Sequence, residues 1–391
     1  MKSGDPDPHA PPLAGLSVDQ FMRRHWQRAP LLIRQAIPDF EPPLDAAALI
    51  ELASDDSVES RFVARRRGRW ILEHGPFEAD RLPALSGRDW TLLVQGADLH
   101  SDAARALLSR FRFVPDARLD DLMISLAADG GGVGPHQDSY DVFLLQAWGR
   151  RRWRIGRVAE PQLVPGLPLR VLANFEAERE WLLEPGDMLY LPPGWGHDGI
   201  AEGPCMTCSV GFRAPSRHEF LAAFLAEAAD SPGGPDPRFG DPGRRPVDPV
   251  DAARIPDDLH RKLADWARRW RPTVAQVDEF IGRYLSEPKA GVWFDAPTAL
   301  GLKPFIERIR RQGIALDRRT RMLWRGHKVY INGEVEHAPA GTRSLIRRLA
   351  ERRHLGAADL QTVADDNELL PILHQWHKAG WLRLTPARKR P

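Results

Sequence analysis

The sequence of 391 residues lacks most of the features that mark secreted or membrane-spanning proteins. It has only two cysteines, too few for a fold stapled by disulfides. It contains no run of about 18 apolar residues that could cross a bilayer as a helix. Its first twelve residues are polar and proline-rich and lack the apolar stretch of a signal peptide. We therefore expect a cytoplasmic protein with no membrane attachment.

The two cysteines form one C-x-x-C pair, Cys205 and Cys208. A structural zinc site of this type needs a second pair of ligands, and the sequence has no second C-x-x-C. The surrounding segment is typical of a strand, on which residues three apart point to opposite faces. We interpret the pair as two small strand residues and not as a redox centre.

A glycine-rich stretch at residues 130–143 carries a His-x-Asp pair, His136 and Asp138. Residues two apart on a strand share a face, so this imidazole and this carboxylate can bind one metal ion. A second histidine would complete a 2-His-1-carboxylate triad, which holds non-haem Fe(II) and leaves positions open for a co-substrate and dioxygen. The candidate is His197, which follows a Pro-Pro-Gly turn about sixty residues later.

The order of the elements around these three residues indicates a double-stranded β-helix, or cupin. An apolar strand at 122–126 enters the glycine-rich turn, and another at 142–145 follows the His-x-Asp pair. A Pro-Gly-Asp turn and a short strand precede the segment that carries His197. In a cupin the metal ligands lie on neighbouring strands. The pattern therefore predicts a mainly β fold with flanking helices.

The same residues resemble a known family, the bacterial JmjC-type ribosomal oxygenases, which depend on Fe(II) and 2-oxoglutarate. The likeness is strong over residues 15–216 and rests on layout elsewhere. It implies an enzyme that uses Fe(II), 2-oxoglutarate and dioxygen to hydroxylate an arginyl residue of the sixteenth large-subunit ribosomal protein at its β-carbon, giving 3-hydroxyarginine. The matching segments are 28–34, 120–125, 130–142, 149–154, 184–187, 192–194 with His197, and 209–215.

The far carboxylate of 2-oxoglutarate needs a cation deep in the barrel, and the planar guanidinium of arginine suits a carboxylate best. Matching to the family gives this role to Arg151, with Arg150 and Arg152 as neighbouring alternatives. Ser125 and Ser209 lie on strands expected to line the same cavity. Each is a candidate hydrogen-bonding group for the co-substrate and is equally compatible with a small core residue.

An arginyl substrate needs a carboxylate for its guanidinium and an aromatic face for its stem. If strand alternation holds, Asp121 shares a face with Ser125 and points toward the mouth of the cavity. Tyr140 continues the face of the His-x-Asp pair beside the metal. Our hypothesis is that Asp121 pairs with the substrate guanidinium and Tyr140 packs along its stem. The alternative is that Asp121 caps the end of a strand and that the ring of Tyr140 belongs to the core.

The chain changes character after Pro215 and divides into three predicted domains. Helical periodicity with apolar stripes follows, interrupted at 231–249 by proline and glycine. In the resembling family this part is a dimerisation segment, so we predict a homodimer through residues 218–290. Helices with a small β-wing then resemble a winged-helix module. The predicted domains are 1–215 (JmjC/cupin, catalytic), 216–298 (helical, dimerisation) and 299–391 (winged-helix-like).

Charge is unevenly distributed, although the net charge of the chain is only +2. Residues 301–391 contain 19 Lys and Arg against 9 Asp and Glu. This excess indicates an acidic or RNA-rich partner, or only a solvated surface, and leaves direct nucleic-acid binding open. Two other functions compete with a ribosomal oxygenase: a cupin metalloenzyme acting on a small molecule, and a winged-helix regulator with a cupin sensor. Arg151 and the JmjC-like motifs favour the oxygenase.

Overall fold

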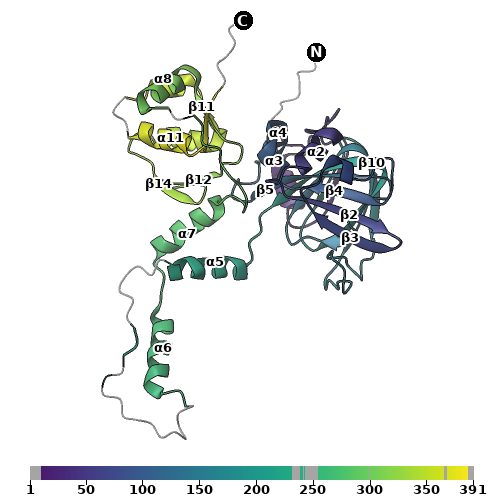
Figure 1. The fold of residues 1–391 in the computed structure, drawn as a ribbon, viewed down its shortest axis with the longest axis horizontal. Helices are drawn as coiled ribbons and strands as arrows, with labels where there is room; N and C mark the ends of the chain where they lie inside the picture. Colours follow the sequence, from purple (N-terminus) through teal and green to yellow (C-terminus); the bar gives the residue numbers. More distant parts are fainter. Residues whose placement is uncertain are drawn as a thin grey trace.

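The structure is a computed structural model, and it describes residues 10–230, 238–240, 242, 254–298, 300–364 and 368–385. A β-rich N-terminal body and a mixed C-terminal body lie side by side (Figure 1). Three helices of the described chain lie between them in sequence: α5 (Arg217–Asp230), α6 (Asp257–Arg269) and α7 (Val274–Ser286). The predicted linker at 231–249 lies almost wholly outside the described residues.

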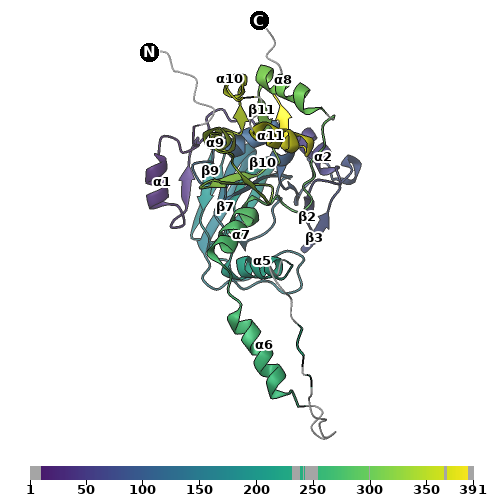
Figure 2. The ribbon, with the colours of Figure 1, turned by 90° about the vertical axis from the view of Figure 1, so that its left-hand side faces the viewer.

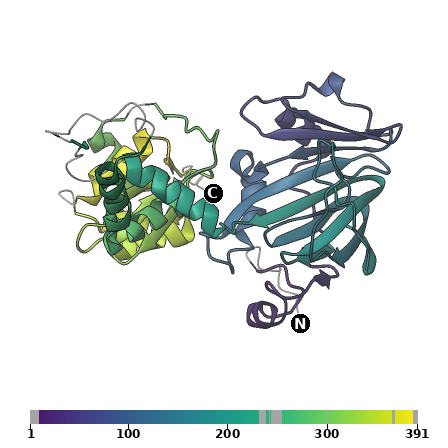
Figure 3. The same cartoon turned by 90° about the horizontal axis from the view of Figure 1, so that it is seen from below.

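The N-terminal body is built on one strongly curved sheet of ten antiparallel strands (Figure 3). Its order is β1-β9-β7-β10-β5-β4-β2-β3, with β6 paired to β10 and β8 paired to β7. This sheet confirms the predicted β-rich fold. The strands are β1 (Leu31–Ile33), β2 (Ser60–Arg66), β3 (Arg69–His74), β4 (Trp90–Val94), β5 (Leu119–Ala127), β6 (His136–Gln137), β7 (Val142–Arg157), β8 (Arg179–Leu183), β9 (Met188–Leu191) and β10 (Trp195–Phe212).

Strand alternation gives this sheet two apolar cores, one on each face. On the outer face, Leu122, Ile124 and Leu126 of β5 join the large core with Phe111 and Phe143. Residues from the flanking helices contribute to this core: α1 (Val18–Arg24), α2 (Ala46–Ala53), α3 (Ala97–His100) and α4 (Asp102–Ser109), with the 3-10 turn η1 (Ala79–Arg81) nearby in the chain. The inner face carries the smaller core of Val142, Leu144, Trp153, Ile155, Leu183, Leu189, Leu191 and Trp195.

The two cysteines lie on β10, as the sequence predicts. Cys208 belongs to the large outer core, whereas Cys205 packs with Ala127 and Ala201. Both thiols are buried and free. Their separation onto different cores confirms that the C-x-x-C pair follows a strand pattern.

The C-terminal body has two three-stranded antiparallel sheets and a single core. One sheet has the order β15-β11-β16, and the other is the meander β12-β13-β14. The meander turns at Gly326 and at Asn332-Gly333, all with positive φ, as expected for tight hairpin turns. Its elements are α8 (Leu302–Gln312), β11 (Ile314–Leu316), β12 (Met322–Arg325), β13 (Lys328–Ile331), β14 (Glu334–His337), α9 (Arg343–Arg352), β15 (His354–Leu355), α10 (Ala357–Gln361), α11 (Leu369–Lys378) and β16 (Leu382–Leu384).

Helix α7 packs on this meander, although the sequence assigned it to a separate helical domain. The hydroxyl of Ser286 accepts a hydrogen bond from the backbone N–H of Gly333 at 3.2 Å. A Cβ atom at Gly282 would lie 2.2 Å from the ring of Tyr330, so a larger residue would push this strand away. Contacts therefore cross the boundary that the sequence places at residue 298.

The other two helices of this region differ in how much they are covered. Helix α5 packs against α7 through Phe220 and Phe224, whose ring centroids lie 5.4 and 5.0 Å from that of Phe280. Helix α6 (Asp257–Arg269) projects away from both bodies (Figure 2), and none of its residues is buried. Among the described helices, none has the length and apolarity needed to traverse a bilayer.

Charged contacts join the two bodies. Nε of Arg318 donates to the carbonyl of Leu99 at 2.7 Å. Arg318 and Arg383 also lie 3.3 and 3.1 Å from the carboxylate of Asp102. Part of the basic excess of residues 301–391 therefore has its acidic partner within the same chain.

Candidate metal and co-substrate site

His136, Asp138 and His197 come together on the inner face of the sheet. Strand β6 pairs with β10 so that His136 lies directly opposite His197. One ligand atom from each of the three residues lies within 4.8 Å of the others, and Nε2 of His197 is 3.7 Å from Oδ2 of Asp138. Two imidazoles and one carboxylate at this spacing suit a single Fe(II)-type cation and leave coordination positions open.

Both imidazoles are oriented by backbone carbonyls. Nδ1 of His136 is 2.9 Å from the carbonyl of Gly134, and Nδ1 of His197 is 3.3 Å from that of Trp195. Because a carbonyl only accepts, each Nδ1 carries the proton and each Nε2 keeps its lone pair. Burial, together with the neighbouring His136, lowers the pKa of His197 to about 4. The ring is therefore neutral near pH 7, as a metal ligand must be.

Arg151 points into the inner face because β7 contains a bulge. Before the bulge the inner face carries even-numbered residues, and strict alternation would continue to Arg150 and Arg152. The pairing of β7 with β10 shifts its register here, and Gly149 adopts a φ of 62°. Beyond the bulge the alternation is displaced by one residue. Arg151 is consequently 5% exposed, whereas Arg150 is exposed and Arg152 pairs with two glutamates.

The guanidinium of Arg151 makes no ion pair within the described part of the chain. Its Nε and Nη2 atoms are buried without a hydrogen-bond partner, and so is Nε1 of Trp153. The guanidinium lies 5.8 Å from the ring of Trp153, whose centroid is 5.8 Å from that of His197. An anionic ligand between the metal cluster and Arg151 would satisfy these donors. Trp153 was not predicted as a site residue, although its place two residues after Arg151 on one strand was an available signal.

Ser125 and Ser209 lie on the inner face. Ser125 is 3% exposed, and its hydroxyl is 3.5 Å from the carbonyl of Thr207. Ser209 is 8% exposed and lies opposite Leu144, a member of the inner core. The structure thus brings both hydroxyls to the face that carries Arg151, and their contact with a co-substrate stays a prediction.

Asp121 and Tyr140 lie close together on the same side of β10. A Cβ atom at Gly211 would be 3.8 Å from Oδ1 of Asp121 and 3.8 Å from Cε2 of Tyr140. Oδ2 of Asp121 is held by Nζ of Lys289 at 3.0 Å, a contact that nothing in the sequence suggested. Burial and the charges of Asp138 and Asp121 raise the pKa of Tyr140, so its phenol stays neutral. Asp121 is 3% exposed, so these groups form a buried, lysine-paired carboxylate next to a partly exposed aromatic ring.

A curved cupin sheet with a 2-His-1-carboxylate cluster, and with a buried unpaired arginine on the same face, defines the class of JmjC-type oxygenases. Comparison with known families agrees with this class. The JmjC domain family matches residues 106–220, and the ROXA-like winged helix family matches residues 267–383. The AraC-like ligand binding domain matches residues 175–271. The winged-helix match includes α7, in keeping with its packing on the meander.

Similar proteins narrow the class to one family. The chain is 34% identical over 370 residues to ribosomal protein uL16 3-hydroxylase of Escherichia coli K12, covering 94% of this chain and 97% of that protein. It is also 35% identical over 205 residues to a probable ribosomal oxygenase of Haemophilus influenzae. This aligned stretch covers 51% of this chain and 50% of that protein. The X-ray structure of E. coli YcfD has a TM-score of 0.82 at 31% identity and covers 95% of this chain and 98% of that chain. YcfD with cobalt and 2-oxoglutarate has a TM-score of 0.79 at 31% identity, with 95% and 98% covered. The chain therefore belongs to the ribosomal oxygenases, which confirms the resemblance seen in the sequence.

Proposed function

We propose that this protein is an Fe(II)- and 2-oxoglutarate-dependent oxygenase that hydroxylates an arginyl residue of ribosomal protein uL16 at its β-carbon. The observation that carries the proposal is the buried, unpaired guanidinium of Arg151 on the same face as the cluster of His136, Asp138 and His197. The name of the E. coli relative and the related structure with cobalt and 2-oxoglutarate support it. The proposal includes a cytoplasmic location, since ribosomal proteins are made there.

The residues present fit the metal and the co-substrate. The two Nε2 atoms and the carboxylate of Asp138 would hold Fe(II) and leave positions for 2-oxoglutarate and dioxygen. When bound, iron with these two co-substrates supplies the oxidising equivalents for C–H hydroxylation, as 2-oxoglutarate is converted to succinate and carbon dioxide. Arg151 binds the far carboxylate through its planar fork, and Nε1 of Trp153 adds a donor along the way. Ser125 and Ser209 line the same face and donate hydroxyl hydrogen bonds to the co-substrate.

The carboxylate of Asp121 beside the ring of Tyr140 supports an arginyl substrate. Oδ2 of Asp121 lies 3.0 Å from Nζ of Lys289 and accepts hydrogen bonds from Nε2 of Gln95 at 2.6 Å and from the backbone N–H of Gly96 at 3.0 Å. Oδ1 lies on the side of Tyr140, so it is the oxygen that receives the substrate guanidinium in our proposal. The ring of Tyr140, 39% exposed, packs along the aliphatic stem. A cationic side chain held this way brings its β-carbon toward the metal cluster.

The test is mass spectrometry of uL16 incubated with the purified protein, Fe(II) and 2-oxoglutarate. We expect a mass gain of one oxygen atom, located by fragmentation at the β-carbon of one arginine. The variant Asp138→Ala should give no gain, whereas Asp80→Ala, which removes an exposed carboxylate from η1, should behave as the wild type. Turnover of 2-oxoglutarate without modification of uL16 would keep the co-substrate assignment and reject the substrate.

The proposal includes a homodimer formed through residues 218–290. Helix α6 has no buried residue, yet its apolar stripe leaves Leu263 47% exposed, and Trp270 at its end is 45% exposed. On α5, Leu221 and Leu225 are 43% and 52% exposed. Apolar side chains gathered on a projecting segment are typical of a surface covered by another subunit.

A further inference from the structure

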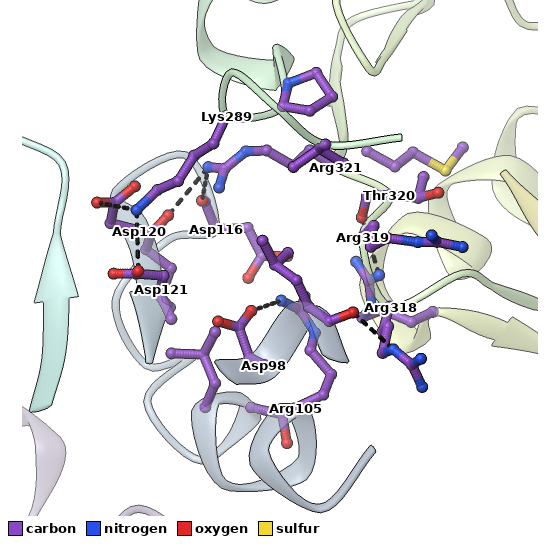
Figure 4. Close-up of a pocket in the computed structure, with 18 of the residues that line it drawn as sticks. Asp98, Arg105, Asp116, Asp120, Asp121, Lys289, Arg318, Arg319, Thr320 and Arg321 are labelled. Carbon is purple, nitrogen blue, oxygen red and sulfur yellow. Dashed lines mark hydrogen bonds and ion pairs between the residues drawn. The ribbon is translucent and has the colours of Figure 1, made fainter. Parts of the chain in front are cut away.

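A small cavity lies at the start of β5, where the N-terminal and C-terminal bodies meet (Figure 4). Its volume is about 40 Å³, and a single buried water needs roughly 10–15 Å³ on the same measure. The cavity therefore has room for about three water molecules, or for one tetrahedral oxyanion of similar size. Seven cationic side chains and four carboxylates line it, which is an excess of positive charge.

The four carboxylates are already committed to other cations. Both oxygens of one of them accept hydrogen bonds from a single guanidinium, at 2.7 and 2.6 Å. The pairs are Arg112 with Asp116, Arg105 with Asp98, and Lys289 with both Asp120 and Asp121. The remaining lining arginines of the 318–319 segment pair with carboxylates outside the cavity. None of these pairs involves Arg321 or Arg353.

Among the cations that line the cavity, Arg321 and Arg353 have no carboxylate ion-pair partner within the described residues. Nη2 of Arg321 donates to the carbonyls of Asp116 and Leu119, at 3.2 and 3.0 Å. Nη2 of Arg353 donates to two carbonyls of the C-terminal body at 2.8 and 2.9 Å. Carbonyl oxygens satisfy the Nη2 groups but carry no net charge, so the two guanidinium charges have only the more distant carboxylates of Asp98, Asp116 and Asp120 to offset them.

The backbone at Arg353 gives a second indication. This residue ends α9 with a φ of 61°, the left-handed conformation in which glycine is the usual residue. A branched or long side chain there costs stability that a glycine would not. The chain nevertheless has an arginine at this position, and its side chain lines the cavity. The conformation thus serves to deliver a guanidinium to the interface.

A third guanidinium, that of Arg105, completes the cluster. Its Nε is buried without a hydrogen-bond partner, although its Nη1 is paired with Asp98. Burial lowers the pKa of Arg321 to about 10, and burial with the nearby charge of Arg105 lowers the pKa of Arg353. Arginine stays charged at physiological pH regardless. These charges therefore persist, and a bound counter-ion would relieve their unfavourable energy.

We propose that this cavity is a binding site for a small inorganic oxyanion of the phosphate class, held by Arg321, Arg353 and Nε of Arg105. Arg105 belongs to the N-terminal body, and the other two arginines belong to the C-terminal body. The anion therefore bridges the two bodies and fixes the winged-helix unit against the catalytic sheet. The doubly charged form of phosphate matches the two guanidinium groups that form no ion pair. A nucleotide exceeds the volume of the cavity.

The experiment is titration of the full-length protein with inorganic phosphate at constant ionic strength, followed by calorimetry and by thermal unfolding. We expect saturable binding with a Kd of about 1 mM or tighter and a matching rise in Tm. Arg321→Gln and Arg353→Gln should each weaken binding about tenfold or more, because each loses a charge-assisted contact. Arg343→Gln makes the same charge change at an exposed position of α9 and should leave the Kd unchanged.

Several outcomes would overturn the proposal. The first is absence of saturable phosphate binding to the wild type, a result that does not depend on any variant folding correctly. Equal weakening by Arg343→Gln would mean that phosphate responds to net charge alone. A parallel titration with adenosine monophosphate tests a larger phosphate compound. If the nucleotide does not bind, the result agrees with a site for the free ion. If the nucleotide binds and inorganic phosphate does not, the proposal is rejected.

Discussion

The change Arg151→Gln tests the co-substrate site most directly. The side chain is 5% exposed, and its Nε and Nη2 atoms have no partner in the described part of the chain. A hydrogen bond between charged groups contributes about 1.5–3 kcal/mol, and about 1.4 kcal/mol corresponds to tenfold in affinity. The KM for 2-oxoglutarate should therefore rise roughly ten- to a hundredfold. Changes in kcat at saturating co-substrate should be much smaller, because Arg151 is assigned to the far carboxylate of 2-oxoglutarate and not to the substrate carbon that is hydroxylated.

The same substitution should affect the co-substrate-free protein in the opposite direction. An unpaired buried charge is costly, so removing it should leave the Tm without 2-oxoglutarate unchanged or raise it. The increase in Tm on adding 2-oxoglutarate, which follows the ratio of its concentration to Kd, should shrink. A loss of ligand-induced stabilisation without a loss of intrinsic stability is a pattern that general damage to the fold does not produce.

The assay is steady-state turnover with an arginyl peptide, together with thermal unfolding with and without 2-oxoglutarate. Arg150→Gln is the matched control, because it removes the same charge one residue away at an exposed position. Its KM should equal that of the wild type. A raised KM in Arg150→Gln but not in Arg151→Gln would show that the bulge in β7 directs a different arginine inward. An unchanged KM in both variants would refute the reasoning.

Four further predictions concern the metal, the substrate, the assembly and acid stability. Asp138→Ala should abolish turnover and weaken Fe(II) binding, measured by titration, with little change in the Tm of the metal-free protein. Asp121→Asn should depress hydroxylation of an arginyl peptide much more than peptide-independent decarboxylation of 2-oxoglutarate. Leu263→Asp places a charge on the exposed stripe of α6 and should give monomers in sedimentation at micromolar concentration. Burial raises the pKa of Asp120, but the charges of Lys289 and Arg213 lower it by more, so its folded pKa lies below the usual 3.8. The contribution of Asp120 to stability is complete above the unfolded pKa of 3.8 and is lost as the pH falls through the lower folded pKa. Asp120→Asn should therefore flatten the acid limb of the unfolding profile below about pH 4.

Each of these expectations has an outcome that contradicts it. Normal turnover by purified Asp138→Ala would remove the carboxylate from the metal site. Equal losses in both reactions of Asp121→Asn would mean that this residue supports the fold or the metal cluster and does not read the substrate. A monomeric wild type would reject the dimer, and a dimer that persists in Leu263→Asp would reject its formation through the exposed stripe of α6. An acid limb of the same steepness in Asp120→Asn would assign the acid sensitivity to other carboxylates.

The sequence alone was enough for the features that depend on local pattern. Alternation along β5 placed Asp121 and Ser125 on the face opposite the large core, because successive side chains of a strand must point to opposite sides. The chemistry of the His-x-Asp pair needed only the strand period and the donor types. The positions of Cys205 and Cys208 on different faces followed from the same rule. Each of these inferences spans only a few residues, over which the backbone period stays in phase.

The family resemblance favoured Arg151, but only the tertiary structure shows why this arginine, and not its neighbours, enters the inner face. The three candidates at 150–152 are adjacent, and a one-residue change in register moves every following side chain to the other face. That change occurs where Gly149 adopts a positive φ against β10, a pairing partner about fifty residues away in sequence. Strand alternation by itself would have placed Arg150 and Arg152 on the inner face, because it carries no information on a bulge.

Charge compensation was also a property of the folded chain and not of the sequence. The basic excess of residues 301–391 indicated an external acidic or RNA partner, yet Arg318 and Arg383 contact Asp102 of the N-terminal body. Lys289 holds Asp121 from a segment more than a hundred residues away. The energy of a charge depends on its burial and on the charges within a few ångströms, and both are set only when distant segments come together.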